Sequence, residues 1–302
     1  MMPVAALVIN RNTHRLLGDC LRSLQAQEYE GPITTWVVDN GSTDGSAAMV
    51  VSGFPGVQLV RNDRNVGYAA ACNQGIRYSS EPVVLVMNSD TVLSPDTVRV
   101  LVEHMEANPG AAIVAPRLLN SDGSIQFSCR EFPSITTAFM HAFLGLFRGD
   151  NPYSAGYKKM DWDHGTECTV DWVSGAFMAL RREAMDALGG FDEGYFMYVE
   201  DVDLCWRARR DGWTVDYLPG GDVYHHIGMS SRAVSTRMSF HHHASMLRFH
   251  RKTYSGKARR LVNPVVALGV ASRFALIVAL NTYYRLRSLL GGRDRHIMPG
   301  RQ

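Results

Sequence analysis

The chain has 302 residues, of which 46% are hydrophobic, and a formal net charge of +2 at pH 7. That length and apolar content predict one large α/β domain with an appendage. The five cysteines are odd in number and scattered without a CxxC or Cys/His cluster, which argues against a disulfide framework or a zinc site. This cysteine usage favours a reducing, cytoplasmic compartment. The first apolar run begins almost at the N-terminus, so no signal peptide is expected.

Three strands, each followed by polar turn residues and a helix, are predicted in the first third of the chain. The expected strands are residues 4–9, 36–38 and 58–60. Strands that alternate with helices predict a parallel sheet with crossover connections. Polar residues at three successive strand ends are typical of a nucleotide pocket, although neither GxGxxG nor GxxxxGK[ST] occurs to indicate a dinucleotide or P-loop site.

A fourth strand is predicted at 83–87, an unbroken apolar run that fits a strand buried on both faces. The next residues, Asn88, Ser89 and Asp90, therefore follow the carboxyl end of a strand, where open α/β sheets bind ligands. Asp90 is either a ligand for Mg²⁺ or Mn²⁺, and through it for a diphosphate, or an Asx-turn or capping residue. The residues alone leave both interpretations open.

A second acidic site lies in GFDEGYFMYVEDVDLCWRARRDGW, residues 190–213. Its carboxylates, Glu200, Asp201 and Asp203, follow an aromatic run and open a predicted helix that extends to Arg210. Acids in a first helical turn complement the helix dipole, and a carboxylate beside apolar rings can have its pKa adjusted for proton transfer. Capping and catalysis are the two alternatives for each acid.

Five motifs, taken in order, resemble one known family. They are VVDNGSTDGS at 37–46, RNDRNVGYAAACNQGI at 61–76, VLVMNSD at 84–90, GGFDEGYFMYVEDVDLCWRARRDGW at 189–213 and LPGGDVYHH at 218–226. Over residues 4 to about 230 the chain resembles the inverting glycosyltransferases of family 2, which have the GT-A fold. Within the family it is most similar to bacterial rhamnosyltransferases that act on lipid-linked or polysaccharide acceptors, and residues 139–159 contribute to that similarity.

The resemblance implies a fold and its division. Residues 1–235 would form a GT-A (Rossmann-like) catalytic domain, a mostly parallel central sheet flanked by helices. About 1–120 would bind the nucleotide-sugar and about 121–235 the acceptor, with a basic, partly apolar helical extension at 236–302.

The resemblance also assigns a donor pocket. Asp39 would contact the nucleotide base, and Gly67 would let the backbone approach the ribose and diphosphate. The full set of expected nucleotide-sugar ligands is Asn10, Asp39, Asn40, Arg61, Asn65, Gly67, Asn88, Ser89, Asp90 and Gly175.

A divalent cofactor, Mn²⁺ or Mg²⁺, is expected because Asn88 and Asp90 stand where the family has its DxD motif. The first acid is replaced by Asn here, so Asp90 is the expected metal ligand and Asn88 either assists it weakly or contacts the ribose. His225 matches a histidine that completes the metal site in related enzymes, with His226 able to take its place; a purely structural histidine is the alternative.

Asp201 matches the family's catalytic base and Glu200 its partner. A sugar hydroxyl is a poor nucleophile at neutral pH, so a carboxylate must accept its proton as the new bond forms. Trp172, Ser174 and Gly175 would form the wall near the donor sugar, where Trp172 would also contact the acceptor; a core aromatic is the alternative for Trp172. Asp192 and Glu193 would contact the acceptor, or only shape their turn.

Charge is distributed unevenly along the chain. Residues 241–302 hold twelve Lys or Arg and one acid, a balance of +11 against −9 for the remainder. An apolar run at 265–280, interrupted by Arg273, predicts a helix that lies in the interface of an anionic membrane, since Arg273 makes spanning costly. Packing of an ordinary helix on the domain is the alternative. The histidines at 241–243 are expected to pack or to contact an acceptor diphosphate.

The sequence thus predicts an enzyme that uses a nucleotide-sugar, with dTDP-rhamnose as the expected donor and a lipid-linked or polysaccharide-precursor glycan as acceptor. It is expected to be cytoplasmic and peripheral on the inner face of the plasma membrane; a homodimer is left open. Alternatives are a UDP- or GDP-sugar donor, a non-catalytic nucleotide-sugar binding module, and a nucleotidyltransferase of similar fold. No nucleic-acid recognition motif is present, so nucleic acid is not an expected partner.

Overall fold

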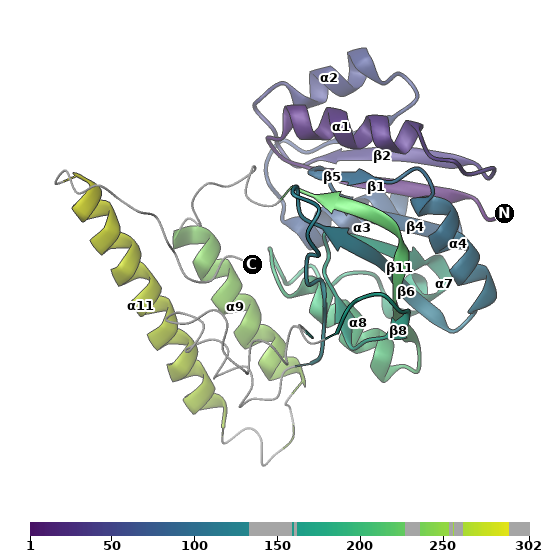
Figure 1. Ribbon diagram of the computed structural model, residues 1–302. Coiled ribbons are helices and arrows are strands. Elements are labelled where there is room, and N and C mark those ends of the chain that lie inside the picture. The colour runs from purple at the N-terminus through teal and green to yellow at the C-terminus, as the bar shows by residue number, and fades with distance from the viewer. Residues whose placement is uncertain (133–158, 160–161, 227–235, 254–255, 257–261, 290–302) are drawn as a thin grey trace.

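The computed structural model describes residues 1–132, 159, 162–226, 236–253, 256 and 262–289, with side chains as far as 283. Within these ranges the chain forms an α/β fold in which helices flank a mostly parallel central sheet and further helices follow at the C-terminal end (Figure 1). This confirms the expected fold class. Most of the segment 139–159, which supported the subgroup resemblance, lies outside the described residues.

The central sheet has nine strands in the described part of the chain, in the order β3-β2-β1-β4-β10-β6-β11-β5, with β8 beside β11. Six strands run in one direction, while β10, β5 and β8 are antiparallel to their neighbours. The strand bounds are β1 Val4–Asn10, β2 Ile33–Asp39, β3 Gln58–Arg61, β4 Val83–Asn88, β5 Thr91–Leu93, β6 Ala111–Leu119, β8 Cys168–Thr169, β10 Phe177–Arg181 and β11 Thr214–His225. A second, two-stranded sheet pairs β7 (Cys129–Arg130) with β9 (Trp172–Val173).

Two layers of helices cover the two faces of the sheet because its strands are apolar on both sides. In β1, Ala5, Leu7 and Ile9 face one core while Val4, Ala6 and Val8 face the other, the two-residue period of a strand. The first core includes α3 (Tyr68–Tyr78), α7 (Arg182–Leu188) and α8 (Glu200–Arg210). The second includes α1 (His14–Gln25), α2 (Ser46–Gly53) and α4 (Thr97–Ala107).

Strand register brings the polar strand ends to one edge of the sheet. Asn10 at the end of β1 is paired with Asp39 at the end of β2, and Asp39 in turn with Arg61. On the other side of β1, Ile9 is paired with Asn88 at the end of β4. Residues that are far apart in the sequence therefore meet where parallel strands end.

Two long helices make up the described part of the C-terminal extension, α9 (Thr236–Thr253) and α11 (Asn263–Leu289). Figure 1 shows α9 between the sheet domain and α11, and α11 packs against α9. By length and composition α11 is able to cross a membrane over Asn263–Tyr283, and none of the residues in this stretch is buried. Its Arg273 side chain is turned toward α9, where it donates to Nε2 of His243 at 3.0 Å.

Candidate active site

Buried polar side chains join the ends of β1, β2 and β4. Asn10 Nδ2 donates to Asp39 Oδ2 at 2.8 Å, and the backbone N–H of Ser42 donates to Asp39 Oδ1 at 2.9 Å. Thr13 Oγ1 donates to Asn10 Oδ1 at 2.6 Å and lies 2.6 Å from Ser89 Oγ. Asn10, Asp39 and Ser89 are thus brought together as predicted. Thr13 was not predicted; a hydroxyl three residues beyond a strand end was the available signal.

The turn that follows β3 is built around Asn40. Its side chain donates to Asn65 Oδ1 at 3.0 Å and accepts the N–H of Val66 at 2.9 Å, so its amide is used to shape the turn. Gly67 has φ 97° and ψ 163°, a backbone conformation that is essentially confined to glycine. A Cβ there would lie 2.7 Å from the carbonyl oxygen of Phe196. Arg61, at the end of β3, is exposed.

A carboxylate and an imidazole meet at the end of β4. His225 Nε2 lies 3.3 Å from Asp90 Oδ1 and 3.4 Å from Asn88 Nδ2. Gln126 Oε1 lies 2.8 Å from His225 Nδ1, and such an outer partner fixes the orientation of a ligating imidazole. His226 is turned elsewhere, with its Nδ1 2.6 Å from Ser121 Oγ.

This donor set fits a divalent cation that is also held by a substrate diphosphate. The described residues contain no cluster of three or more His, Cys, Asp or Glu side chains able to hold a metal by themselves. Asp90 and His225 nevertheless supply an oxygen and a nitrogen donor within 3.3 Å of each other. Mg²⁺ commonly binds through one or two carboxylates plus substrate phosphates, so two protein ligands suffice.

The acids of the second site lie in the first turn of α8, where they divide into different roles. Asp201 is partly exposed, and its Oδ2 and Oδ1 accept the N–H groups of Gly175 and Val202, each at 2.8 Å. Glu200 is buried, and its Oε2 accepts no hydrogen bond from any described residue. Burial raises the pKa of both carboxyls, and for Glu200 the charge of Asp201 adds to the effect. For Asp201 the two N–H donors oppose the shift without cancelling it.

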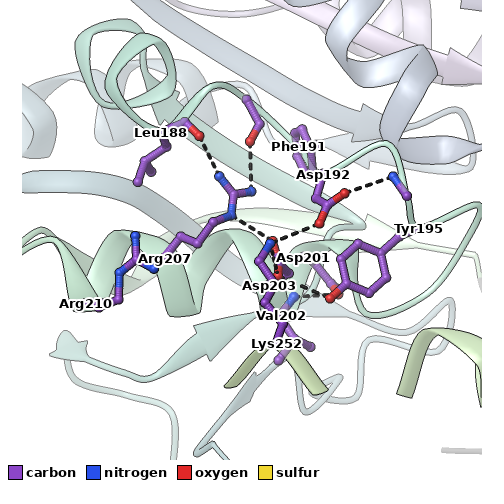
Figure 2. Close-up of polar contacts among 12 residues, drawn as sticks. Leu188, Phe191, Asp192, Tyr195, Asp201, Val202, Asp203, Arg207, Arg210 and Lys252 are labelled. Carbon is purple, nitrogen blue, oxygen red and sulfur yellow. Dashed lines mark hydrogen bonds and ion pairs between the residues drawn. The ribbon is translucent and has the colours of Figure 1, made fainter. Parts of the chain in front are cut away.

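Asp203 is a structural acid. Figure 2 shows it beside Tyr195, Arg207 and Lys252. It is fully buried, 2.7 Å from Arg207 Nε and 2.7 Å from Lys252 Nζ, and Tyr195 donates its hydroxyl to it at 3.2 Å. Arg207 also donates to the carbonyls of Leu188 and Gly190, so Asp203 fastens α8 both to the preceding turn and to α9.

One short turn connects the two acidic sites. The N–H of Gly175 holds Asp201, while the carbonyl of the next residue, Ala176, accepts the N–H of Asn88 at 2.9 Å. Tyr68 donates its hydroxyl to the carbonyl of Gly175 at 2.7 Å. A Cβ on Gly175 would lie 3.2 Å from Cβ of Asp201, so the close approach favours glycine. The carboxylate of α8 and the end of β4 are therefore neighbours.

The three residues predicted to touch the acceptor all have partners within the protein. Trp172 is buried in the core and donates its indole N–H to the carbonyl of Glu131 at 3.1 Å. Asp192 is paired with Arg248 and Lys252 of α9 at 2.8 and 3.0 Å. Glu193 accepts from the Asn73 amide at 2.9 Å and from Arg77 at 3.2 Å. Their acceptor role stays a prediction.

Comparison with known proteins identifies the family. The family model described as "Glycosyl transferase family 2" matches residues 6–189. The chain belongs to this family. The N-acetylglucosaminyl-diphospho-decaprenol L-rhamnosyltransferase of Mycobacterium tuberculosis is 34% identical to this glycosyltransferase over 259 residues, which cover 82% of this chain and 83% of the relative. Rhamnosyltransferase WbbL of Escherichia coli is 25% identical, covering 64% and 70% of the two chains.

Solved structures confirm the fold of this family 2 glycosyltransferase. The mannosyltransferase PcManGT from Pyrobaculum calidifontis, in complex with GDP-Man and Mn²⁺, superposes with a TM-score of 0.58 at 19% identity and covers 94% of this chain and 80% of its own. GalNAc-T7 with UDP, GalNAc and Mn²⁺ gives a TM-score of 0.57 at 13% identity, covering 74% and 44%. The GT-A fold and the family expected from the motifs are both confirmed, and the protein is a glycosyltransferase.

Proposed function

We propose that this glycosyltransferase transfers L-rhamnose from dTDP-rhamnose to a hydroxyl of a lipid-linked glycan precursor, with inversion at the anomeric carbon. Support for the sugar and the acceptor comes from the mycobacterial relative, whose name specifies L-rhamnosyl transfer to an N-acetylglucosaminyl-diphospho-decaprenol and which matches 82% of the chain. The E. coli relative is likewise a rhamnosyltransferase.

The observation that carries the mechanism is the position of Asp201. Its carboxylate is fixed by two N–H donors, at Gly175 and Val202, one turn away from the end of β4. In the proposed step the acceptor hydroxyl gives its proton to Asp201 as its oxygen bonds to the anomeric carbon of the donor. The bond between that carbon and the diphosphate oxygen breaks on the opposite face, and its electron pair leaves with the nucleoside diphosphate.

The donor would be held along the strand-end edge. Asn10 and Asp39 are buried beside each other at the ends of β1 and β2, and Asp39 would accept a hydrogen bond from the base. Gly67 would lie close to the ribose and diphosphate, as the family resemblance implies, and its missing Cβ leaves room for the carbonyl oxygen of Phe196. Asp90 and His225 would hold Mn²⁺ or Mg²⁺, which when bound offsets the negative charge that develops on the leaving diphosphate.

The extension supports a place at the inner face of the plasma membrane. Val265 and Leu268 of α11 are each 69% exposed, and basic residues lie on both sides of this apolar helix in the sequence. Apolar surface with flanking Lys and Arg binds anionic membranes. Flotation with anionic liposomes, with and without residues 255–302, tests the membrane association. The full-length protein should float and the truncated protein should not; failure of the full-length protein to float contradicts the proposal.

Calorimetric titration of dTDP, UDP and GDP, each with and without Mn²⁺, tests the donor. Tight, Mn²⁺-dependent binding of dTDP over the other two is the expected result. Preference for UDP or GDP keeps the glycosyltransferase and removes the rhamnose donor. In an assay with dTDP-rhamnose and a lipid-linked N-acetylglucosamine acceptor, dTDP and one rhamnosylated product of inverted configuration should appear; pyrophosphate as product would indicate nucleotidyl transfer instead.

A further inference from the structure

The segment that leads into the catalytic acids is covered by α9, residue after residue. We call Tyr195–Val199 the approach loop, since Glu200 and Asp201 follow it directly. Four residues of this loop contact α9. The Tyr195 ring lies 5.2 Å from the guanidinium of Arg248, and the Phe196 ring stacks on His241 with centroids 4.3 Å apart and planes at 25°. The Met197 carbonyl accepts from Ser245 Oγ at 3.1 Å, and the Tyr198 ring meets His242 edge-on with centroids 5.3 Å apart.

The approach loop has a backbone that needs support from outside. Tyr198 and Val199 have φ of 69° and 71°, in the left-handed region that residues other than Gly, Asn and Asp rarely adopt. Val199 is β-branched, which makes this conformation more unfavourable still. Such residues persist only where surrounding structure over-determines them. Contacts from α9 to Phe196, Met197 and Tyr198 provide that support at the positions where the chain turns into α8.

The other side of the loop meets the donor pocket. The carbonyl of Phe196 accepts the N–H of Tyr68 at 2.8 Å, and the same oxygen occupies the space that a side chain at position 67 would need. Phe196 is therefore held between Gly67 and Tyr68 on one side and His241 on the other. The backbone of Phe196 is thus anchored by the Tyr68 N–H, while its ring rests on His241, so loss of the His241 contact releases the loop on the side of α9 and leaves its anchor at the donor turn.

The histidines of α9 are suited to packing against neighbouring side chains. Burial, followed by the charges of Arg273 and His243, lowers the pKa of His242 to about 4, so this ring is neutral at physiological pH. His243 Nδ1 lies 2.6 Å from the Ser239 carbonyl oxygen, and its Nε2 accepts from Arg273. Adjacent residues on a helix point in different directions, and here His241, His242 and His243 each have a different partner.

We infer that α9 is a positioning element of the active site, in which His241, His242 and Ser245 hold the approach loop so that Asp201 faces the acceptor hydroxyl. The inference rests on the proposed role of Asp201 as base. It makes the extension more than an attachment to a membrane: one of its helices completes the support of the catalytic carboxylate.

The test compares three histidines of α9 in the full-length protein. His241→Ala and His242→Ala remove contacts to the approach loop. His250→Ala is the matched control on the same helix, because Nε2 of His250 lies 2.9 Å from Oδ1 of Asn263. A misplacement of about 1 Å can cost on the order of 10²-fold in rate. We therefore expect kcat to fall between roughly 10-fold and 10²-fold for the first two variants, while the donor KM and the kcat of His250→Ala change little by comparison.

Two further variants keep the test decisive if an alanine variant does not fold. His241→Phe preserves an aromatic ring over Phe196 and should restore kcat, and Ser245→Ala removes a single hydroxyl and should lower kcat with an unchanged thermal midpoint. If His241→Ala, His242→Ala and Ser245→Ala all retain the kcat of His250→Ala, the inference is overturned. An Asp201→Asn variant measured in parallel separates the two proposals. Full activity of this variant would show that Asp201 is not the base. An inactive Asp201→Asn variant beside fully active α9 variants would contradict only the positioning role of α9.

Discussion

The strand ends proposed to bind the donor, here called the donor edge, and the proposed base Asp201 are held in place by different kinds of structure. Asn10, Asp39 and Asn88 end strands whose register is set by two apolar cores, so their positions follow from the sheet. Asp201 instead lies in the first turn of α8, which follows a strained loop, and that loop is supported by α9, which begins at Thr236. Sheet register fixes the positions of the strand-end residues, whereas side-chain contacts between distant segments fix the position of Asp201.

If the proposed roles are right, this difference separates nucleotide binding from catalysis within one site. Perturbing the donor edge should weaken nucleotide binding and leave the carboxylate in place. Perturbing α8 or its supports should lower turnover while nucleotides still bind. The ion pair of Asp203 with Lys252 links α8 to α9, and the pair of Asp203 with Arg207 lies within α8, so both belong to the structure that supports Asp201 (Figure 2).

Asp201→Asn is the sharpest way to break the comparison. The amide keeps the size of the side chain but accepts no proton, and general base catalysis contributes typically about 10²- to 10⁴-fold. We expect kcat to fall by about that factor while calorimetric nucleotide affinity changes little. Comparable losses in kcat and nucleotide affinity would show that the two regions are not separable.

The pH profile of the unsubstituted enzyme should carry the same signature. Because burial raises the pKa of Asp201, the carboxylate is ionised only above its raised pKa, and kcat/KM should decline as the pH falls through that value. The acid limb should therefore lie above the ordinary aspartate pKa of about 3.9. An acid limb at or below that value would mean that a different group acts as the base.

Asp203→Asn should have the next largest effect, this time on stability. Removal of the buried carboxylate leaves the cations of Arg207 and Lys252 without it, and breaking a buried ion pair costs about 3–5 kcal/mol. Urea denaturation measures the loss. The matched control is Asp211→Asn, which removes an exposed pair with Arg210 at the C-terminal end of the same helix and should leave the midpoint nearly unchanged. Equal effects of the two substitutions would contradict a structural role specific to Asp203.

Gln126→Ala tests the donor edge without touching a proposed metal ligand. Gln126 contacts Nδ1 of His225, and loss of such an outer partner typically lowers metal affinity about 10- to 100-fold. Mn²⁺-dependent nucleotide binding should weaken by that factor, while metal-free nucleotide binding and the thermal midpoint stay close to those of the parent protein. Unchanged Mn²⁺ dependence would remove His225 from the proposed metal site.

The sequence predicted well that the strand ends of the donor edge lie together, because the pattern that forms each strand is local. Apolar runs fix β1, β2 and β4, and parallel strands must end at one edge, so Asn10, Asp39 and Asn88 could be placed together before any contact was known. The acids at 200–203 were found by their spacing and by the family resemblance. Their separate roles were not predictable, because they depend on where Arg207, Lys252 and the Gly175 turn lie.

The contacts of α9 show why the support of the approach loop could not be predicted from the sequence. Its histidines were expected to pack or to contact a diphosphate, and no local pattern indicates that His241 meets Phe196 or that Ser245 meets Met197. Those contacts join residues about 45 positions apart through the docking of a helix, which the 3.6-residue period alone does not specify. The strained φ of Val199 is likewise a result of tertiary support, since its β-branched side chain disfavours that conformation.

Thr13→Val should give the smallest of these effects and lies wholly on the donor edge. The substitution keeps the shape of the side chain but removes the hydroxyl that donates to Asn10 and touches Ser89, and a typical hydrogen bond contributes about 0.5–1.5 kcal/mol. We expect a loss of stability in that range and a few-fold weaker nucleotide binding, because Asn10 in turn orients Asp39. Turnover at saturating donor should stay close to that of the parent enzyme. A lowered kcat with unchanged nucleotide affinity would mean that the strand ends position the reacting groups as well as the nucleotide, and the division between the two regions would then be wrong.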